Sequence, residues 1–284
     1  MTDIERDARA LIDAFDGDAA FFAQNLLTGE EVGFRADSVM PTASTIKLLV
    51  LAEVIRQAEA GQFALDDPLP MISEDQSGGS GILKDLSPAT LLTIRDHATL
   101  MIALSDNTST MALVRLAGRA RIEQAGQEWG MTATTLPIDR APDGDARDYA
   151  ASTPRDIVHL LQLIATDALV SPAASATVRD ILVTQQYHDQ IGRYLPYNQY
   201  QRVGAAHEGP IVVRSKSGFM TDSNGAVRVD AGIIEISGVQ RYVLCLMTEH
   251  HPDMGFGPEH PGAIVNGRIS RLIFDAWGGT MDVP

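Results

Sequence analysis

Stretches patterned like β-strands lie at both ends of the chain, and a long helical region separates them. Two such runs near the N-terminus, Ala19 to Leu27 and Glu31 to Phe34, flank Thr28-Gly29, which fits a hairpin turn. After residue 203, three more runs have strand character: Ile211-Val212-Val213, Ala231 to Ile234 and Tyr242 to Met247. If strands from both ends of the chain form one sheet, the middle of the chain must fold as an insertion between them. The pattern therefore predicts one α/β unit assembled from both termini and an inserted all-helical unit.

The expected boundaries follow from where the periodicity changes. We expect residues 1–48 and 204–284 to form the α/β domain and residues 49–203 the all-helical domain. The chain of 284 residues is long enough for two intimately joined domains. Apolar residues at helical spacing predict helices over residues 5–15, 44–60, 90–104, 107–117, 121–129, 154–166, 172–186 and 261–277. A loop from about Thr132 to Thr153 is long enough to indicate a functional segment.

Charge and cysteine content narrow the possible partners and compartment. The formal net charge is −15, which argues against nucleic acid because phosphate binding needs clustered Lys and Arg. The single cysteine, Cys245, lies in an apolar run and cannot form an internal disulfide. The first residues are charged, and no later run is long and apolar enough to span a membrane. We expect a cytoplasmic monomer that binds a small molecule, although an exported chain without its leader would look the same.

Ser44 and Lys47 are the first candidates for chemistry. They stand three residues apart where a helical pattern begins, so both side chains are expected on one helix face. Backbone N–H groups at a helix start favour developing negative charge. A serine needs a base to become a nucleophile, and a desolvated lysine amine can serve. Taken alone, the pair is better explained as a helix cap followed by an exposed lysine.

Two further elements accompany this pair. In Ser105-Asp106-Asn107, Ser105 can relay a proton to a leaving group and the Asn107 amide can hold a substrate carbonyl. All three residue types also favour helix caps, which is the simpler explanation. In Lys216-Ser217-Gly218, at a strand end, Lys216 can hold Ser105 and a substrate anion. We expect Ser217 and Gly218 to contact the substrate there, although a solvated strand end would also fit.

The three elements in this order form the signature of class A β-lactamases and penicillin-binding proteins. Over nearly its whole length the chain resembles the class A β-lactamase family. The most specific stretch runs from Leu92 to Thr108, and Gly79 to Leu83, Arg147-Asp148 and Asp230 to Ile234 are also similar.

The resemblance implies a two-domain fold, in which an antiparallel sheet is flanked by helices and the site lies in the cleft beside the helical domain. It implies Ser44 as nucleophile and Lys47 as proton acceptor in acylation. It further implies an oxyanion hole formed by the backbone N–H groups of Ser44 and Phe219, worth ~3 kcal/mol or more in the transition state. No cofactor and no metal are expected, since the seven histidines include no ligand motif such as H-E-x-x-H.

The chain departs from the family pattern at two places. In the family, a glutamate in the long loop activates the hydrolytic water. The corresponding residues here, 134–145, contain no glutamate. Asp139, Asp143 or Asp145 is the available substitute, with Asp139 as the candidate for water activation. The family often carries an arginine for the substrate carboxylate where this chain has Ala231. Arg214 and Arg228 are the candidate replacements.

These features predict a serine hydrolase that forms an acyl-enzyme at Ser44, with a β-lactam as the best substrate guess and impaired or non-standard deacylation. Two alternatives remain open. One is a glutaminase-like amidase or esterase that acts on a small non-lactam substrate. The other is a non-catalytic penicillin-binding sensor that is acylated once and stays acylated.

Overall fold

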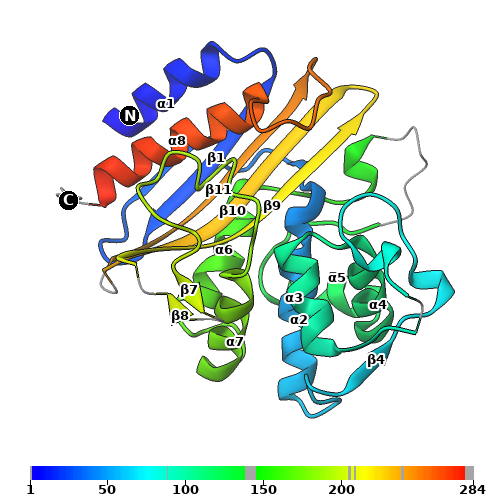
Figure 1. Ribbon diagram of the computed structural model, residues 1–284. Coiled ribbons are helices and arrows are strands. Elements are labelled where there is room, and N and C mark those ends of the chain that lie inside the picture. Colours follow the sequence, from blue (N-terminus) through cyan, green and yellow to red (C-terminus); the bar gives the residue numbers. More distant parts are fainter. Residues whose placement is uncertain are drawn as a thin grey trace.

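The computed structural model describes residues 2–87, 89–137, 145–203, 206–207, 209–237 and 240–278 (Figure 1). A five-stranded sheet is its centre, with all neighbouring strands antiparallel, in the order β2-β1-β11-β10-β9. The strands are β1 (Asp18–Asn25), β2 (Glu31–Phe34), β9 (Ile211–Asp222), β10 (Gly225–Ile236) and β11 (Gln240–His251). The two chain ends therefore share one sheet, as the sequence pattern predicts.

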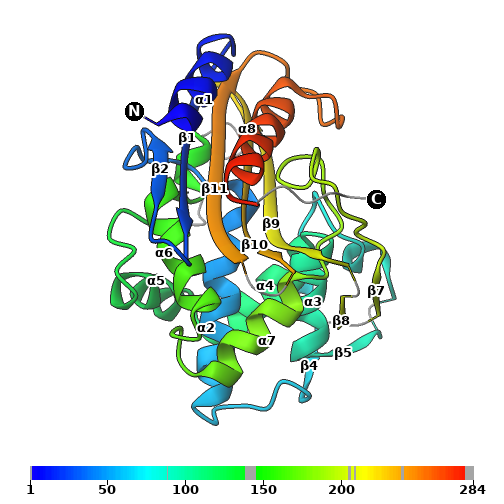
Figure 2. The ribbon, with the colours of Figure 1, turned by 90° about the vertical axis from the view of Figure 1, so that its left-hand side faces the viewer.

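Helices cover both faces of the sheet. α1 (Asp3–Asp13) and α8 (Pro261–Trp277) lie side by side on one face, and α6 (Pro154–Ala165) packs on the other (Figures 1 and 2). The inner strand β10 is buried on both sides: Ala231 and Ile233 join the core shared with α6, whereas Ile234 and Ile236 join the core under α8. Each fully buried side chain of this size contributes roughly 1.5–3 kcal/mol. The same strand therefore contributes side chains to both hydrophobic cores.

The helical part is built around α2 (Lys47–Glu59). Ten of its residues are buried, so it is apolar nearly all round and is surrounded by other helices. Its neighbours are α3 (Ile94–Ala103), α4 (Asn107–Ala117), α5 (Arg119–Glu128) and α7 (Pro172–Leu182). The helix ends before Gly61, whose φ of 75° suits glycine. The division of the chain into two domains at the expected residues stays a prediction.

The helix expected over residues 90–104 is wrong in its first residues. Residues 91–93 form the short strand β5 (Leu91–Thr93), paired with β4 (Pro68–Pro70), and α3 begins only at Ile94. The reason is a capping box: the Thr93 side chain accepts from the Asp96 backbone N–H, and the Asp96 carboxylate accepts from the backbone N–H of Thr93.

The remaining elements are short. They are β3 (Met40–Pro41), β6 (Ala151–Ser152), β7 (Arg202–Val203), β8 (Ala206–His207), η1 (Ala43–Ile46), η2 (Ser73–Asp75), η3 (Leu83–Asp85) and η4 (Ala146–Asp148). Among the described residues, no helix combines the length and the apolar character needed to cross a membrane.

Candidate active site

Ser44 lies in the 3₁₀ turn η1, which continues directly into α2. The sequence pattern predicts one continuous helix from Ser44, but the α-helix proper starts only at Lys47. Strand β3, just before the turn, pairs with β6, and the Thr42 backbone N–H donates to Ala150 O at 3.0 Å. Ala43 has a φ of 43°, a left-handed conformation that costs an alanine roughly 1–2 kcal/mol. The surrounding pairing thus holds a strained turn that presents Ser44.

Lys47 follows on the next turn and is fully buried. Its Nζ lies 2.7 Å from Ser105 O, 3.0 Å from Ser105 Oγ and 2.8 Å from Asn107 Oδ1. Burial, reinforced by the charge of Lys216, holds the pKa of Lys47 well below its ordinary value, although Asp106 opposes the shift. A lysine in this state gives up its proton readily, as a general base must.

The segment Ser105-Asp106-Asn107 joins α3 to α4 in a strained loop. Ser105 is buried and has a φ of 53°. Asp106 has the capping role that its residue type favours: its Oδ1 accepts the N–H of Ser109 at 2.8 Å. Its Oδ2 accepts the N–H groups of Ile82 and Leu83 at 2.7 and 2.8 Å. Asp106 therefore fixes the loop, while its neighbours Ser105 and Asn107 hold Lys47.

The glycine-rich loop, residues 77–81, lies against this segment. The Ser80 hydroxyl donates to Ser105 O at 2.7 Å, and the Asn107 side-chain amide donates to Gly78 O at 2.8 Å. At Gly79 and Gly81 φ is positive, and a Cβ at Gly81 would come within 2.3 Å of Asp106 Oδ2. Glycine is therefore required for this loop to pack against the segment Ser105-Asp106-Asn107.

Lys216 and Ser217 lie on the edge strand β9. Lys216 is fully buried, and burial lowers its pKa to about 7, against the attraction of Asp230. Its Nζ donates to Ser217 O at 2.6 Å. The Ser217 hydroxyl accepts from Gln185 Nε2 at 3.4 Å. A second titratable amine thus lies close enough to Lys47 to influence its charge.

Gly218 brings the strand against Ser44. A Cβ at this position would lie 2.8 Å from Ser44 N and 3.0 Å from Thr42 O, so the two backbones touch. This contact sets the backbone of Phe219, the next residue, beside that of Ser44. The close contact explains why a glycine follows Ser217, because any side chain at this position would collide with the backbone of the turn.

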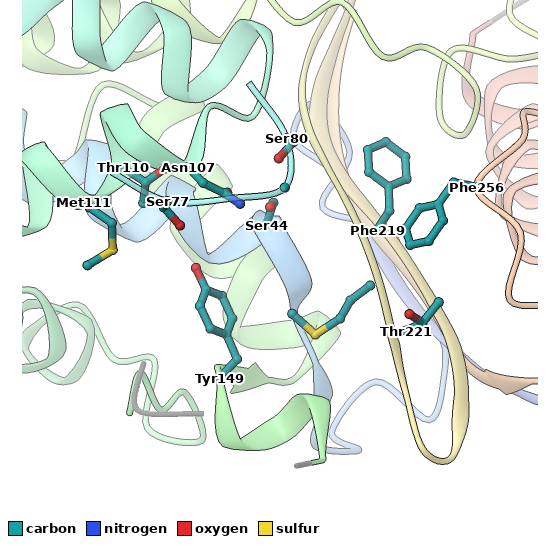
Figure 3. A pocket seen from close by; sticks show the side chains of 12 residues that line it. Ser44, Ser77, Ser80, Asn107, Thr110, Met111, Tyr149, Phe219, Thr221 and Phe256 are labelled. Carbon is teal, nitrogen blue, oxygen red and sulfur yellow. The ribbon is translucent and has the colours of Figure 1, made fainter. Parts of the chain in front are cut away.

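These elements surround a cavity of about 680 Å³, into which Ser44, Asn107 and Tyr149 point (Figure 3). Its lining residues are Ser44, Ser77, Gly79, Ser80, Asn107, Thr110, Met111, Tyr149, Phe219, Met220, Thr221 and Phe256. None of these described residues is a carboxylate. Tyr149 and Phe256 were not among the predicted site residues, because a single tyrosine or phenylalanine in a loop carries no motif.

No described candidate for the missing glutamate or for the carboxylate-binding arginine lines the cavity. Asp139 and Asp143 lie outside the described residues. Asp145 caps η4, where its Oδ1 accepts the N–H of Arg147 at 2.8 Å, and it does not line the cavity. Arg214 pairs with Glu235 at 3.3 Å. Arg228 is buried, with N–H groups on the carbonyls of neighbouring strands and loops, so neither arginine lines the cavity either.

The described residues give little support to a metal site or to a cysteine nucleophile. Within the described ranges, no group of three or more His, Cys, Asp and Glu side chains is arranged to hold a metal ion. Cys245 is buried in β11, and burial raises the pKa of its thiol well above the ordinary value, which disfavours a thiolate nucleophile.

Several known proteins share this sequence pattern and fold. A sequence profile of the Beta-lactamase enzyme family matches residues 3–277. A β-lactamase of Amycolatopsis lactamdurans is 31% identical over 173 residues, which are 58% of this chain and 56% of that protein. The chain thus aligns with little more than half of this relative.

Solved structures extend the similarity over the whole fold. The structure of PBP-A superposes with a TM-score of 0.82 at 25% identity, covering 98% of this chain and 97% of that one. A β-lactamase from Sphaerobacter thermophilus gives a TM-score of 0.82 at 27% identity, covering 96% of each. With the profile match spanning nearly all of the sequence, the chain belongs to the Beta-lactamase enzyme family.

Proposed function

We propose that the chain is a serine hydrolase that opens an amide or lactam bond by forming an acyl-enzyme at Ser44. The observation that carries this proposal is the position of Ser44 in the cavity, one turn before a buried lysine whose pKa is lowered and in backbone contact with β9. The family membership and the β-lactamases among its relatives support the same class of reaction.

Acylation uses buried Lys47 together with the hydroxyl groups of Ser44 and Ser105. Neutral Lys47 takes the Ser44 proton as the Ser44 oxygen attacks the substrate carbonyl. The N–H groups of Ser44 and Phe219 stabilise the oxyanion. As the carbon–nitrogen bond breaks, the Ser105 hydroxyl protonates the departing nitrogen and regains a proton from Lys47, 3.0 Å away. The cycle leaves an ester on Ser44 and a neutral Lys47.

Deacylation needs an activated water, and no described residue of the cavity wall is a carboxylate. In our proposal Lys47, neutral again after acylation, takes the proton from the attacking water. Asp139 is the candidate base from the long loop. A lysine that already serves as the base in acylation is a less effective water activator than a dedicated carboxylate, so we expect hydrolysis to be slower than acylation.

A substrate panel tests the function. Purified protein is assayed with nitrocefin, benzylpenicillin, p-nitrophenyl esters and glutamine, with Ser44→Ala as the control. We expect turnover of a β-lactam or an ester that Ser44→Ala abolishes. Glutamine as the best substrate would indicate a glutaminase-like amidase instead. A stoichiometric adduct without turnover would indicate a sensor.

A further inference from the structure

Two cavities meet beside Ser44, and the rings of Phe219 and Phe256 line both of them. The second cavity has a volume of about 430 Å³ and also shares Ser80 with the first. Its remaining lining residues are Gln186, Tyr187, His188, Asp189 and Pro258. Figure 3 shows the two phenylalanine rings close together on one side of Ser44. The groove at Ser44 therefore continues past a pair of aromatic rings into a second cavity.

Phe256 presents a large apolar surface where the two cavities meet. It is 65% exposed, although phenylalanine is among the residues most often buried in folded proteins. Phe219 and Tyr187 are half-buried, and their rings meet edge to face with centroids 5.3 Å apart. Together with Pro258 the three rings form one apolar wall. Contiguous exposed apolar surface, unlike a single exposed side chain, marks a place where a ligand binds.

The loop that carries Phe256 is fixed to the sheet. Arg228, buried on β10, donates to the carbonyl of Gly255, and its guanidinium lies 5.2 Å from the centroid of the Phe256 ring. The same guanidinium lies 5.9 Å from the centroid of Phe219. Asp253 Oδ1 accepts the N–H of Gly255 at 2.8 Å. Because one buried arginine holds both rings, the exposed face of Phe256 is positioned before a ligand arrives, and binding costs little conformational entropy.

The second cavity lies next to the segment that contains Ser105. The Ser80 hydroxyl, at the boundary of the two cavities, donates to Ser105 O at 2.7 Å. The backbone N–H of Gln186 donates to Ala103 O at 3.1 Å, two residues before Ser105. In the proposed function, Ser105 protonates the atom that departs when the ester on Ser44 forms. The leaving group therefore lies on this side, and the second cavity is the space for its substituent.

We infer that Phe256, together with Phe219 and Tyr187, binds an aromatic substituent on the leaving group of the substrate. The inference rests on the proposed function. Phe256 acts as a specificity residue, because its ring contacts the substituent and none of the reacting atoms. The contact is apolar, so it adds to the binding of a substrate anion near Lys216 and does not replace it.

Esters that differ by one ring at a time test this inference. The phenylacetylglycyl esters of lactate and of 3-phenyllactate share the acyl group, the scissile bond and the carboxylate, and differ by one phenyl ring on the leaving group. The acetylglycyl ester of lactate lacks the phenyl ring on the acyl side instead. Each enantiomer is assayed, and chromatography of the released hydroxy acid gives kcat/KM.

Release of the hydroxy acid reports acylation. Ser44 Oγ bonds to the ester carbon, the carbon–oxygen bond to the hydroxy acid breaks, Lys47 takes the Ser44 proton and Ser105 protonates the departing oxygen. We expect kcat/KM for the better enantiomer of the 3-phenyllactate ester to exceed that of the lactate ester about tenfold, the gain from burying part of one phenyl ring.

Two variants assign the preference to a side chain. Phe256→Ala should lower kcat/KM for the 3-phenyllactate ester about tenfold more than for the lactate ester, and should keep the ratio between the phenylacetylglycyl and acetylglycyl esters of lactate. Met254→Ala is the matched control, because Met254 is in the same loop, is 45% exposed and lines neither cavity. It should keep the wild-type preference.

An equal loss of preference in Met254→Ala would assign the effect to the loop as a whole and overturn the role of Phe256. If Phe256→Ala changed the response to the acyl ring instead, the assignment to the leaving group would be wrong. Ser44-dependent reaction with equal kcat/KM for the two phenylacetylglycyl esters would overturn the inference and leave the proposed function intact. Reaction that survives Ser44→Ala, or no acylation by these esters or by benzylpenicillin, would overturn both.

Discussion

At the scale of single residues, the site depends on how Lys47 is held. A buried ammonium is costly unless it is paired, and the partners of Lys47 are a carbonyl, a hydroxyl and an amide oxygen rather than a carboxylate. These three uncharged groups satisfy the hydrogen bonds of the amine, and none of them stabilises its protonated form as a carboxylate would. Burial and the neighbouring Lys216 then favour the neutral amine.

Replacement of Lys47 by glutamine tests this role. The glutamine amide can still donate to Ser105 and Asn107, but it cannot accept a proton from Ser44. We expect acylation by a β-lactam to slow ~10²–10⁴-fold, the usual contribution of a general base. The wild-type rate should rise with pH as Lys47 loses its proton, whereas the variant should show no such rise. Stopped-flow fluorescence with intact-mass detection measures both, with circular dichroism to confirm folding.

The control is Lys84→Gln, which alters a lysine paired with Asp85 outside the cavity. It should keep the wild-type rate and pH profile. A Lys47→Gln variant that is acylated as fast as the wild type would show that another group takes the Ser44 proton.

Residue types decided how much of the site could be predicted. Ser44, Lys47, Ser105 and Lys216 belong to short patterns whose joint occurrence is specific, and the structure places Lys47 within 3.0 Å of Ser105. Tyr149 and Phe256 line the cavity but stand in unremarkable surroundings in the sequence. Their positions depend on long-range pairing, such as β3 with β6, that local patterns do not encode.

At the scale of elements, the contact between η1 and β9 sets Ser44 against the edge strand. Because Gly218 has no side chain, the strand backbone lies directly against Ser44 and Thr42. The backbone N–H groups of Ser44 and Phe219 belong to these two elements, so their relative position depends on this contact.

Gly218→Ala should therefore displace the strand from the turn. The added Cβ meets backbone atoms at 2.8 and 3.0 Å, which cannot give way as a flexible side chain would. We expect kcat to fall ~10²-fold, comparable to the loss of one oxyanion-hole donor, while the protein remains folded. Steady-state kinetics and circular dichroism measure the two effects.

Gly33→Ala is the matched control on the opposite edge strand β2, where a Cβ would come 3.0 Å from Phe21 O. It should reduce stability without a comparable change in kcat. If Gly218→Ala retained full activity, the close contact would have no role in catalysis.

At the scale of the whole molecule, the pattern of strands at both ends predicted the sheet correctly. Helix ends were less predictable where a cap outweighed apolar periodicity, as at Thr93. The lengths of β9, β10 and β11 were underestimated, because polar residues such as Lys216 and Asp230 interrupt the apolar runs although they are buried in the sheet.

These buried ionisable groups affect the stability of the whole fold. Lys216 has a pKa of about 7 in the folded protein and an ordinary value of 10.5. Between these values the unfolded chain binds more protons than the folded one, so the free energy of unfolding should rise with pH. One such lysine contributes at most ~1.4 kcal/mol per pH unit.

Urea unfolding between pH 7 and 9.5 measures this slope. We expect Lys216→Met to be more stable than the wild type near pH 7 and to have a flatter pH dependence. Lys84→Met, at a more exposed lysine, should leave the slope unchanged. An identical slope in the wild type and Lys216→Met would mean that Lys216 is protonated in the folded protein throughout this range.

The central claim is that Ser44 becomes acylated, and time-resolved intact-mass spectrometry with benzylpenicillin tests it most directly. Opening of the lactam expels no fragment, so the account predicts a protein heavier by the whole antibiotic, with the modified peptide containing Ser44. The adduct should form quickly and decay more slowly, and it should be absent in Ser44→Ala. An adduct of the same mass and rate in Ser44→Ala would contradict the account.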